Sequence, residues 1–223
     1  MPLYLRAEAQ TRLPSLSSGT RSRYYVVELL EEPVVGAWEK PALPLADEAS
    51  LEDAVLVSAR KDQRTIVTAE SCTGGALGAA LTMLPGSSDV YCGGVVSYSY
   101  ELKRVLLGVS DETLQSHGAV SPQCAGEMAA GAARRLGGSD TIAITGIAGP
   151  SGATDTKEVG LVYMATVFGG SSQIWEFHLP GRRQEVRERS VEAALLLLLR
   201  VPRDELSRCT GGRRIEDGKT RIV

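Results

Sequence analysis

The chain has 223 residues, of which 23% are charged and 43% are hydrophobic, and its formal net charge is −3. This length fits one domain with extensions at its ends, or two small domains. The composition is typical of a soluble globular protein and excludes a chain that is disordered throughout. Without a basic excess the chain does not have the profile of a dedicated nucleic-acid binder. No apolar run approaches the roughly 18–20 residues that cross a bilayer, so we expect no membrane partner.

Cysteine and histidine usage argues against a metal site. Four cysteines are spread along the chain, at Cys72, Cys92, Cys124 and Cys209. None of them forms a C-x-x-C pair, and there are only two histidines, His117 and His178. We therefore expect no metal and no cofactor, with reduced thiols and a cytoplasmic location. The first 25 residues contain several arginines and serines, which leaves organelle import as a minor alternative.

The ends of the chain differ from its middle. Residues 1–50 lack sustained periodicity, hold a short strand-like run over 24–30, and then carry three prolines. We interpret them as an extension that is partly disordered or packs on the domain edge. Residues 202–223 form a charged tail, which we expect to be loose. The domain itself is predicted to span residues 51–201.

Within this domain, helical and strand-like patterns alternate. Apolar spacing and capping residues predict helices over about 51–60, 75–83, 101–107, 111–115, 122–136 and 182–200. Runs of β-branched and apolar residues predict strands over about 64–69, 90–98, 140–145, 159–168 and 173–177. The last two strands are separated by Gly169-Gly170, which indicates an antiparallel hairpin. The alternation predicts an α/β domain with a mostly parallel mixed sheet covered on both faces.

The stretch from Thr68 to Gly75 (TAESCTGG) lies where a strand ends and a helix begins. Ligand sites in open α/β sheets lie at such carboxyl ends, and a helix N-terminus offers free N–H groups. Ser71 is a candidate nucleophile there, with backbone N–H groups to stabilise an oxyanion. The alternative is that Ser71 and Thr73 merely cap the helix. Cys72 is a rival nucleophile.

The stretch from Gly93 to Lys103 (GGVVSYSYELK) supplies a candidate base. Lys103 is one of only five lysines in a chain with nineteen arginines. A partly desolvated lysine can titrate low enough to accept a proton, and a Ser–Lys pair can replace Ser–His where histidine is scarce. Tyr98 could relay or hold the proton. The alternative is a solvated helix lysine and an ordinary sheet tyrosine.

The stretch from Thr145 to Gly152 (TGIAGPSG) follows a buried strand, so its glycines would let the backbone approach a ligand at the same sheet edge. It could cradle a phosphate or a ribose, although it matches neither the Walker A pattern nor G-x-G-x-x-G. The alternative is a plain turn. His117 is interpreted as a loop or capping residue, with a role as a base as the alternative, and His178 as a structural residue at a strand end.

Taken together, these motifs resemble the CinA C-terminal domain family, which includes the nicotinamide-nucleotide amidohydrolases. The matching stretches are TAESCTGG from Thr68, LTMLPGSS from Leu81, GGVVSYSYELK from Gly93, LGV from Leu107, HGAVS from His117 and TGIAGPSGATDTKEVG from Thr145. They cover about residues 50 to 200. Tyr100, Ala153 and Glu158 depart from the family pattern, which has asparagine, glycine and proline there. We expect the roughly 50 residues before the matching stretches to be too few to hold the larger N-terminal domain of full-length CinA.

The resemblance implies a three-layer α/β/α sandwich, usually oligomeric, that hydrolyses the carboxamide of nicotinamide mononucleotide (NMN) without a metal. It implies Ser71 as the nucleophile, Lys103 as the base and Tyr98 as an assisting hydroxyl. Two loops are expected to bind the nucleotide, through Thr73, Gly74, Gly75, Thr145, Gly146, Ile147, Ala148 and Gly149. Two alternatives stay open: a relative that hydrolyses another small amide or has lost activity, and a non-enzymatic module that binds nucleotides or partners.

Overall fold

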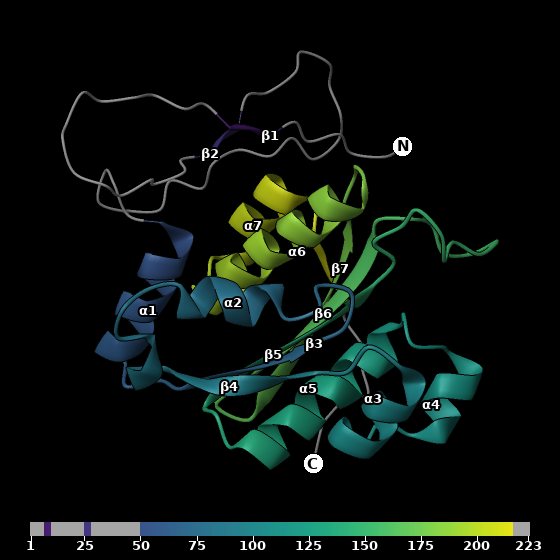
Figure 1. The fold of residues 1–223 in the computed structure, drawn as a ribbon, viewed down its shortest axis with the longest axis horizontal. Helices are drawn as coiled ribbons and strands as arrows, with labels where there is room; N and C mark the ends of the chain where they lie inside the picture. The colour runs from purple at the N-terminus through teal and green to yellow at the C-terminus, as the bar shows by residue number, and fades with distance from the viewer. Residues whose placement is uncertain (1–6, 10–24, 28–49, 216–223) are drawn as a thin grey trace.

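The computed structural model describes residues 7–9, 25–27 and 50–215. Two short strands, β1 (Ala7–Ala9) and β2 (Tyr25–Val27), pair antiparallel. The main sheet has six strands in the order β4-β3-β5-β6-β7-β8 (Figure 1). Their bounds are β3 Ile66–Glu70, β4 Tyr91–Val96, β5 Asp140–Gly146, β6 Leu161–Phe168, β7 Ser171–His178 and β8 Arg213–Ile215.

The arrangement of the central strands decides where the chemistry can lie. β3 pairs in parallel with both β4 and β5, so the carboxyl ends of these three strands meet at one edge of the sheet. β3 is buried along its whole length, as a strand covered on both faces must be. The loops that leave β3, β4 and β5 therefore begin side by side.

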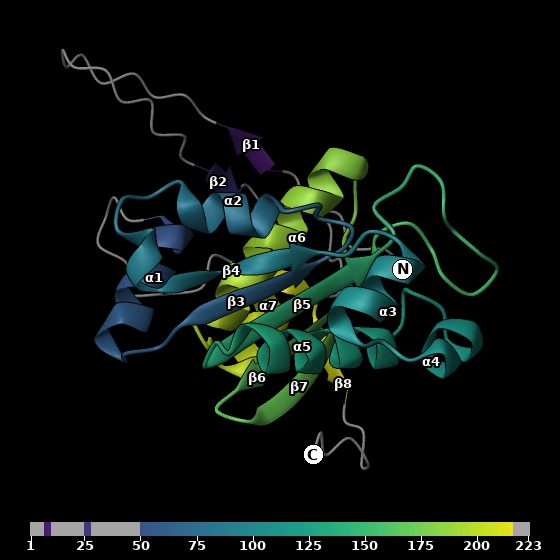
Figure 2. The same ribbon diagram turned by 60° about the horizontal axis from the view of Figure 1, so that its bottom comes forward.

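Helices cover both faces of the sheet, which makes three layers (Figures 1 and 2). One layer contains α1 (Leu51–Lys61), α2 (Ala76–Thr82), α6 (Arg183–Leu198) and α7 (Arg203–Thr210). The other contains α3 (Tyr100–Leu107), α4 (Asp111–Ser116) and α5 (Pro122–Leu136). A short 3-10 helix, Ser87–Asp89, precedes β4. No helix in the part of the chain that the structure describes is long and apolar enough to span a membrane.

Two hydrophobic cores lie on the two sides of the sheet. The larger packs the leucine-rich half of α6 against α1, α2 and the sheet. The smaller packs α5 against the opposite face, with small residues such as Ala125 and Ala129 in contact with the strands. Small side chains let α5 approach the sheet closely and bring α3, which leans on α5, near the edge where the loops begin.

The predicted α/β/α layering and the predicted elements are confirmed, and element ends differ by only a few residues. The expectation of a mostly parallel sheet is wrong in one respect: two of the five strand pairs are parallel and three are antiparallel. The part of the tail over 202–215 is not loose, because it forms α7 and β8. The predicted strand over 24–30 contains β2, while most of the 1–50 extension lies outside the described residues.

Gly131 in α5 is the point of closest approach between α5 and α3. A Cβ on this residue would overlap the carbonyl oxygen of Leu107 at the end of α3. We expect Gly131→Ala to lower the free energy of unfolding by about 1–3 kcal/mol, measured by urea denaturation, because backbone atoms cannot move aside as a side chain can. Gly126→Ala is the matched control, since its Cβ would meet only the tip of the Ile174 side chain at 3.2 Å. A Gly131→Ala protein as stable as the control would contradict this packing.

Candidate active site

The turn between β3 and α2 is built around Glu70. This carboxylate is buried and accepts hydrogen bonds from the backbone N–H groups of Gly75, Leu77 and Gly78, at 3.0, 3.1 and 2.8 Å. It thereby satisfies the free N–H groups of the α2 N-terminus, and its negative charge suits the helix dipole there. The next residue, Ser71, is fixed by its own N–H bond to the Ile144 carbonyl. Glu70 thus anchors the turn that presents Ser71.

We expect Glu70→Gln to lower the free energy of unfolding by about 1.5–3 kcal/mol, since three charge-assisted hydrogen bonds lose their anion. Urea denaturation measures the loss. Glu101→Gln on α3 is the control, because Glu101 is exposed and pairs only with Arg104 at the surface, a contact worth about 0–1 kcal/mol. Equal effects of the two changes would refute the anchoring role of Glu70.

Ser71 and Lys103 meet at this edge of the sheet. The Lys103 Nζ lies 2.7 Å from the Ser71 Oγ and 2.6 Å from the Ser97 carbonyl oxygen. Lys103 reaches them from α3, which begins four residues after β4 ends and is capped by Ser99. Its side chain is fully buried, with 0% exposure, and Ser71 is 8% exposed. The serine hydroxyl is thus held against a desolvated amine.

The surroundings of Lys103 favour its neutral form. Burial lowers the pKa of Lys103 below its usual 10.5, because a charged ammonium loses its hydration there. The thiols that face it, Cys72 and Cys124, offer no negative charge to hold it protonated, because burial raises their pKa values to about 12 and about 11. As a neutral amine, Lys103 can keep its bond to the Ser97 carbonyl and turn its lone pair to the Ser71 hydroxyl. The raised pKa of Cys72 also argues against this thiol as the nucleophile.

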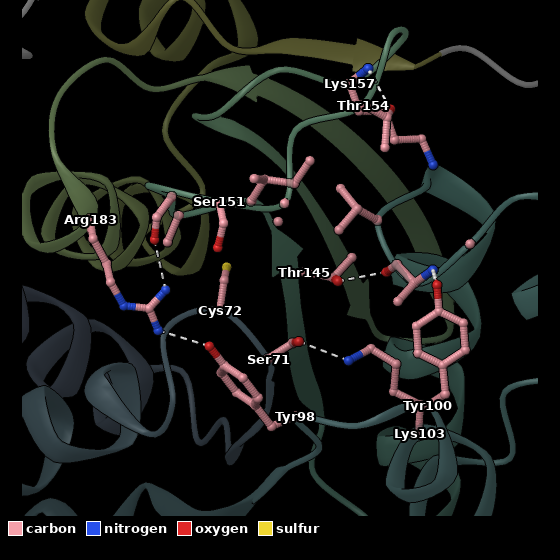
Figure 3. Close-up of a pocket in the computed structure, with 18 residues that line it drawn as sticks. Ser71, Cys72, Tyr98, Tyr100, Lys103, Thr145, Ser151, Thr154, Lys157 and Arg183 are labelled. Atoms are coloured by element: carbon pink, nitrogen blue, oxygen red, sulfur yellow. Dashed lines mark hydrogen bonds between the residues drawn. The ribbon is translucent and has the colours of Figure 1, made fainter.

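Tyr98 lies at the rim of the same site but does not bond to Ser71 or Lys103. Its side chain is 57% exposed, and its hydroxyl oxygen accepts a hydrogen bond from Arg183 at 2.8 Å. The Arg183 guanidinium also donates to the Gly149 carbonyl oxygen at 3.0 Å. Arg183, the first residue of α6, therefore joins the loop after β4 to the loop after β5 (Figure 3).

These side chains line a cavity of about 380 Å³. Ser71 lies on its floor, with Lys103 on one side and Tyr98 and Arg183 on the other (Figure 3). The five residues predicted at the end of β5 and in the loop after it also line the cavity: Thr145, Gly146, Ile147, Ala148 and Gly149. The Thr145 hydroxyl donates to the Ala119 carbonyl at 2.7 Å, which fixes the loop that precedes α5. Gly149 has a φ of +82°, a backbone conformation that favours glycine.

Thr73, Gly74 and Gly75, which were predicted to bind the nucleotide, do not line this cavity. The Gly75 N–H is bound by Glu70, and the Gly74 N–H by the Ser71 carbonyl. The Thr73 carbonyl accepts from Arg187 on the α6 side of the turn. At the N-terminus of α2, the N–H groups of Gly75, Leu77 and Gly78 are therefore occupied by the Glu70 carboxylate.

The two histidines have structural positions. His117 ends α4, and its carbonyl oxygen accepts a hydrogen bond from the Lys157 Nζ at 2.6 Å. Its imidazole is not part of the cavity lining. His178, at the end of β7, contacts the carboxylates of Glu158 and Glu176. Neither imidazole lies at Ser71, in agreement with their interpretation as capping and structural residues.

The sequence interpretation missed Arg183 and Lys157. Arg183 is a cation in the first turn of a helix, where the dipole disfavours positive charge, and this mismatch was the available signal. Lys157 is another of the five lysines, on the long loop between β5 and β6. Within the described residues, no group of three or more His, Cys, Asp or Glu side chains is placed to hold a metal ion.

The chain matches a known protein family over most of its length. The family model described as the CinA C-terminal domain matches residues 48–201. The chain belongs to the CinA C-terminal domain family. The matched range contains Ser71, Lys103, Tyr98 and the whole loop between β5 and β6.

Named relatives and solved structures carry the same family name. A CinA-like protein of Mycobacterium marinum is 49% identical over 147 residues, which are 66% of this chain and 35% of that protein. A putative competence-damage inducible protein of Clostridium acetobutylicum is 45% identical over 84% of this chain and 46% of its own length. This CinA-family chain thus spans about a third to a half of these curated relatives.

Solved structures of competence/damage-inducible proteins match over nearly their full length. That of Klebsiella pneumoniae has a TM-score of 0.66 and 36% identity, over 68% of this chain and 94% of the other. That of Agrobacterium tumefaciens has a TM-score of 0.65 and 40% identity, over 67% and 94%. The CinA fold in those structures therefore corresponds to the three-layer domain described above.

Proposed function

We propose that this CinA-family protein is an amidohydrolase that converts NMN and water to nicotinate mononucleotide and ammonia. The observation that carries the proposal is the 2.7 Å contact between the Ser71 hydroxyl and the buried Lys103 amine. A serine beside a base of lowered pKa is the arrangement of a serine hydrolase without histidine. The choice of NMN as the substrate rests on the resemblance of the motifs to those of nicotinamide-nucleotide amidohydrolases.

The reaction follows from the positions of the two groups. Lys103 takes the Ser71 proton while Oγ attacks the carboxamide carbon, which gives a tetrahedral intermediate. The C–N bond breaks as Lys103 returns the proton to the leaving ammonia, which leaves an ester on Ser71. Water, activated by the same amine, then attacks this ester, the carboxylate leaves, and the proton returns to Ser71. Two half-reactions share one base, and neither uses a metal.

Tyr98 and Arg183 are proposed to act at the carbonyl end of the substrate. The Tyr98 hydroxyl accepts its bond from Arg183, so its own proton is available to a ligand in the cavity. A donor held in this way can stabilise charge on the carbonyl oxygen as the intermediate forms. Arg183 is then the positioning residue for Tyr98.

A second candidate is the hydrolysis of a different small amide. Tyr100 favours it, since this side chain lines the cavity at a position where the family pattern has asparagine. In both cases we propose a small-molecule partner and no cofactor; a homo-oligomeric state stays a prediction.

Product analysis tests the proposal. We expect equal amounts of ammonia and nicotinate mononucleotide from NMN, at a rate that a chelator leaves unchanged. Release of free nicotinamide would indicate cleavage of the glycosidic bond instead, and a rate lost to the chelator and restored by zinc would contradict the metal-free mechanism.

A further inference from the structure

The cavity above Ser71 has a positive lining. Three basic side chains line it, Lys103, Lys157 and Arg183, and its lining, which falls wholly within the described residues, contains no aspartate or glutamate. A cleft lined by charge of one sign concentrates ligands of the opposite sign. The cavity is therefore suited to an anionic small molecule.

Two of the three basic side chains already have a role. Lys103 contacts Ser71, and burial favours its neutral form. Arg183 holds the Tyr98 hydroxyl and the Gly149 carbonyl. The Lys157 ammonium contacts a neutral acceptor, the His117 carbonyl at 2.6 Å. Figure 3 places Lys157 across the cavity from Arg183, with Ser71 between them.

Two hydroxyl groups lie at the Lys157 end of the cavity. The Thr154 hydroxyl oxygen accepts the Lys157 N–H at 3.1 Å, and the Tyr100 hydroxyl oxygen accepts the Ala119 N–H at 3.2 Å. Both hydroxyl groups keep a proton to donate. A Cβ on Gly118 would lie 3.5 Å from the Lys157 Nζ and 3.6 Å from the Tyr100 oxygen, so the ammonium and the phenol both face the same small space.

We propose that Lys157, with Thr154 and Tyr100, forms the subsite for the phosphate monoester of the substrate. The ammonium and the two hydroxyl groups match the three terminal oxygens of a phosphate dianion. A phosphate held at this end would direct the other end of the nucleotide toward Ser71 and Tyr98. The proposal rests on the proposed function, and it places the phosphate away from the N-terminus of α2.

The test compares substrates with and without the phosphate. We expect Lys157→Met to raise the KM for NMN by on the order of 10–100-fold, as for loss of a charge-assisted contact. The kinetics of nicotinamide riboside should stay within about twofold, and Lys157→Arg should retain most of the affinity for NMN. Lys61→Met, an exposed lysine at the end of α1, controls for the lost charge.

A purely structural role for Lys157, as a clamp on the His117 carbonyl, predicts a different result. Lys157→Met would then impair the hydrolysis of NMN and of nicotinamide riboside alike, and that outcome would overturn the proposal of a phosphate subsite.

Calorimetry with ribose 5-phosphate separates this proposal from the proposed function. Loss of that binding in Lys157→Met supports the subsite even if NMN is not hydrolysed. Equal binding by both proteins refutes the subsite even if NMN is hydrolysed.

Discussion

Replacing Lys103 with methionine is expected to reduce NMN turnover by on the order of 10³-fold or more, because the Ser71 hydroxyl then has no base. Lys103→Arg should lose nearly as much, since a guanidinium stays protonated at working pH and cannot accept the serine proton. NMN binding, measured by calorimetry on both variants, should survive.

The pH dependence of the wild-type rate should also show that Lys103 is the base. Below the lowered pKa of Lys103 the amine is charged and cannot accept the serine proton, so the rate should rise as pH increases through that value. The ionisation belongs to the coupled Ser71–Lys103 unit rather than to one residue. A flat profile, or a Lys103→Arg enzyme with wild-type turnover, would show that the base lies elsewhere.

The pH dependence of the free energy of unfolding reports the same ionisation of Lys103. Because the folded pKa of Lys103 is lower than its unfolded value of 10.5, the unfolded chain binds more protons between the two values. The free energy of unfolding should therefore rise with pH across this window, and the rise should be absent from Lys103→Met. A variant with an unchanged slope would mean that Lys103 is not desolvated.

The Ser71–Lys103 pair could be predicted from the sequence because its two residues lie in adjacent strand–loop–helix units. Ser71 follows one predicted strand, Lys103 follows the next, and parallel neighbours end at one sheet edge. Arg183 could not be placed in this way. It comes from a helix 85 residues beyond Tyr98, and the sequence carries no local signal for their contact.

The errors have identifiable causes. The free N–H groups of α2 indicated a ligand site, but the carboxylate of Glu70, one residue before Ser71, already binds them. The parallel share of the sheet was overestimated because the alternation of helices and strands was taken to hold through the whole domain. The 147–160 loop contains no helix, and β6 turns back beside β5.

β8 escaped prediction because it is three residues long and charged. Its pairing with β7 is supported by a tertiary contact, in which the Arg213 guanidinium bonds to the buried carboxylate of Glu176 at 2.6 Å. Such a contact between segments 37 residues apart has no periodicity that a sequence could reveal.

Ser71→Ala has the other large expected effect. Without the hydroxyl no ester can form, so NMN turnover should fall by on the order of 10³-fold or more while the cavity and Lys103 stay in place. Serine and alanine differ by one oxygen atom, and thermal unfolding should show that the variant is folded. Cys72→Ala is the matched control, because the neighbouring thiol is neutral and should leave turnover within a few-fold of wild type.

The most direct test of the account is ammonia release from NMN by the wild-type protein, Ser71→Ala and Cys72→Ala, assayed side by side with nicotinate mononucleotide as the second product. We predict steady release by the wild type and by Cys72→Ala, and essentially none by Ser71→Ala. Continued release by Ser71→Ala, or its loss in Cys72→Ala alone, would contradict the assignment of Ser71 as the nucleophile.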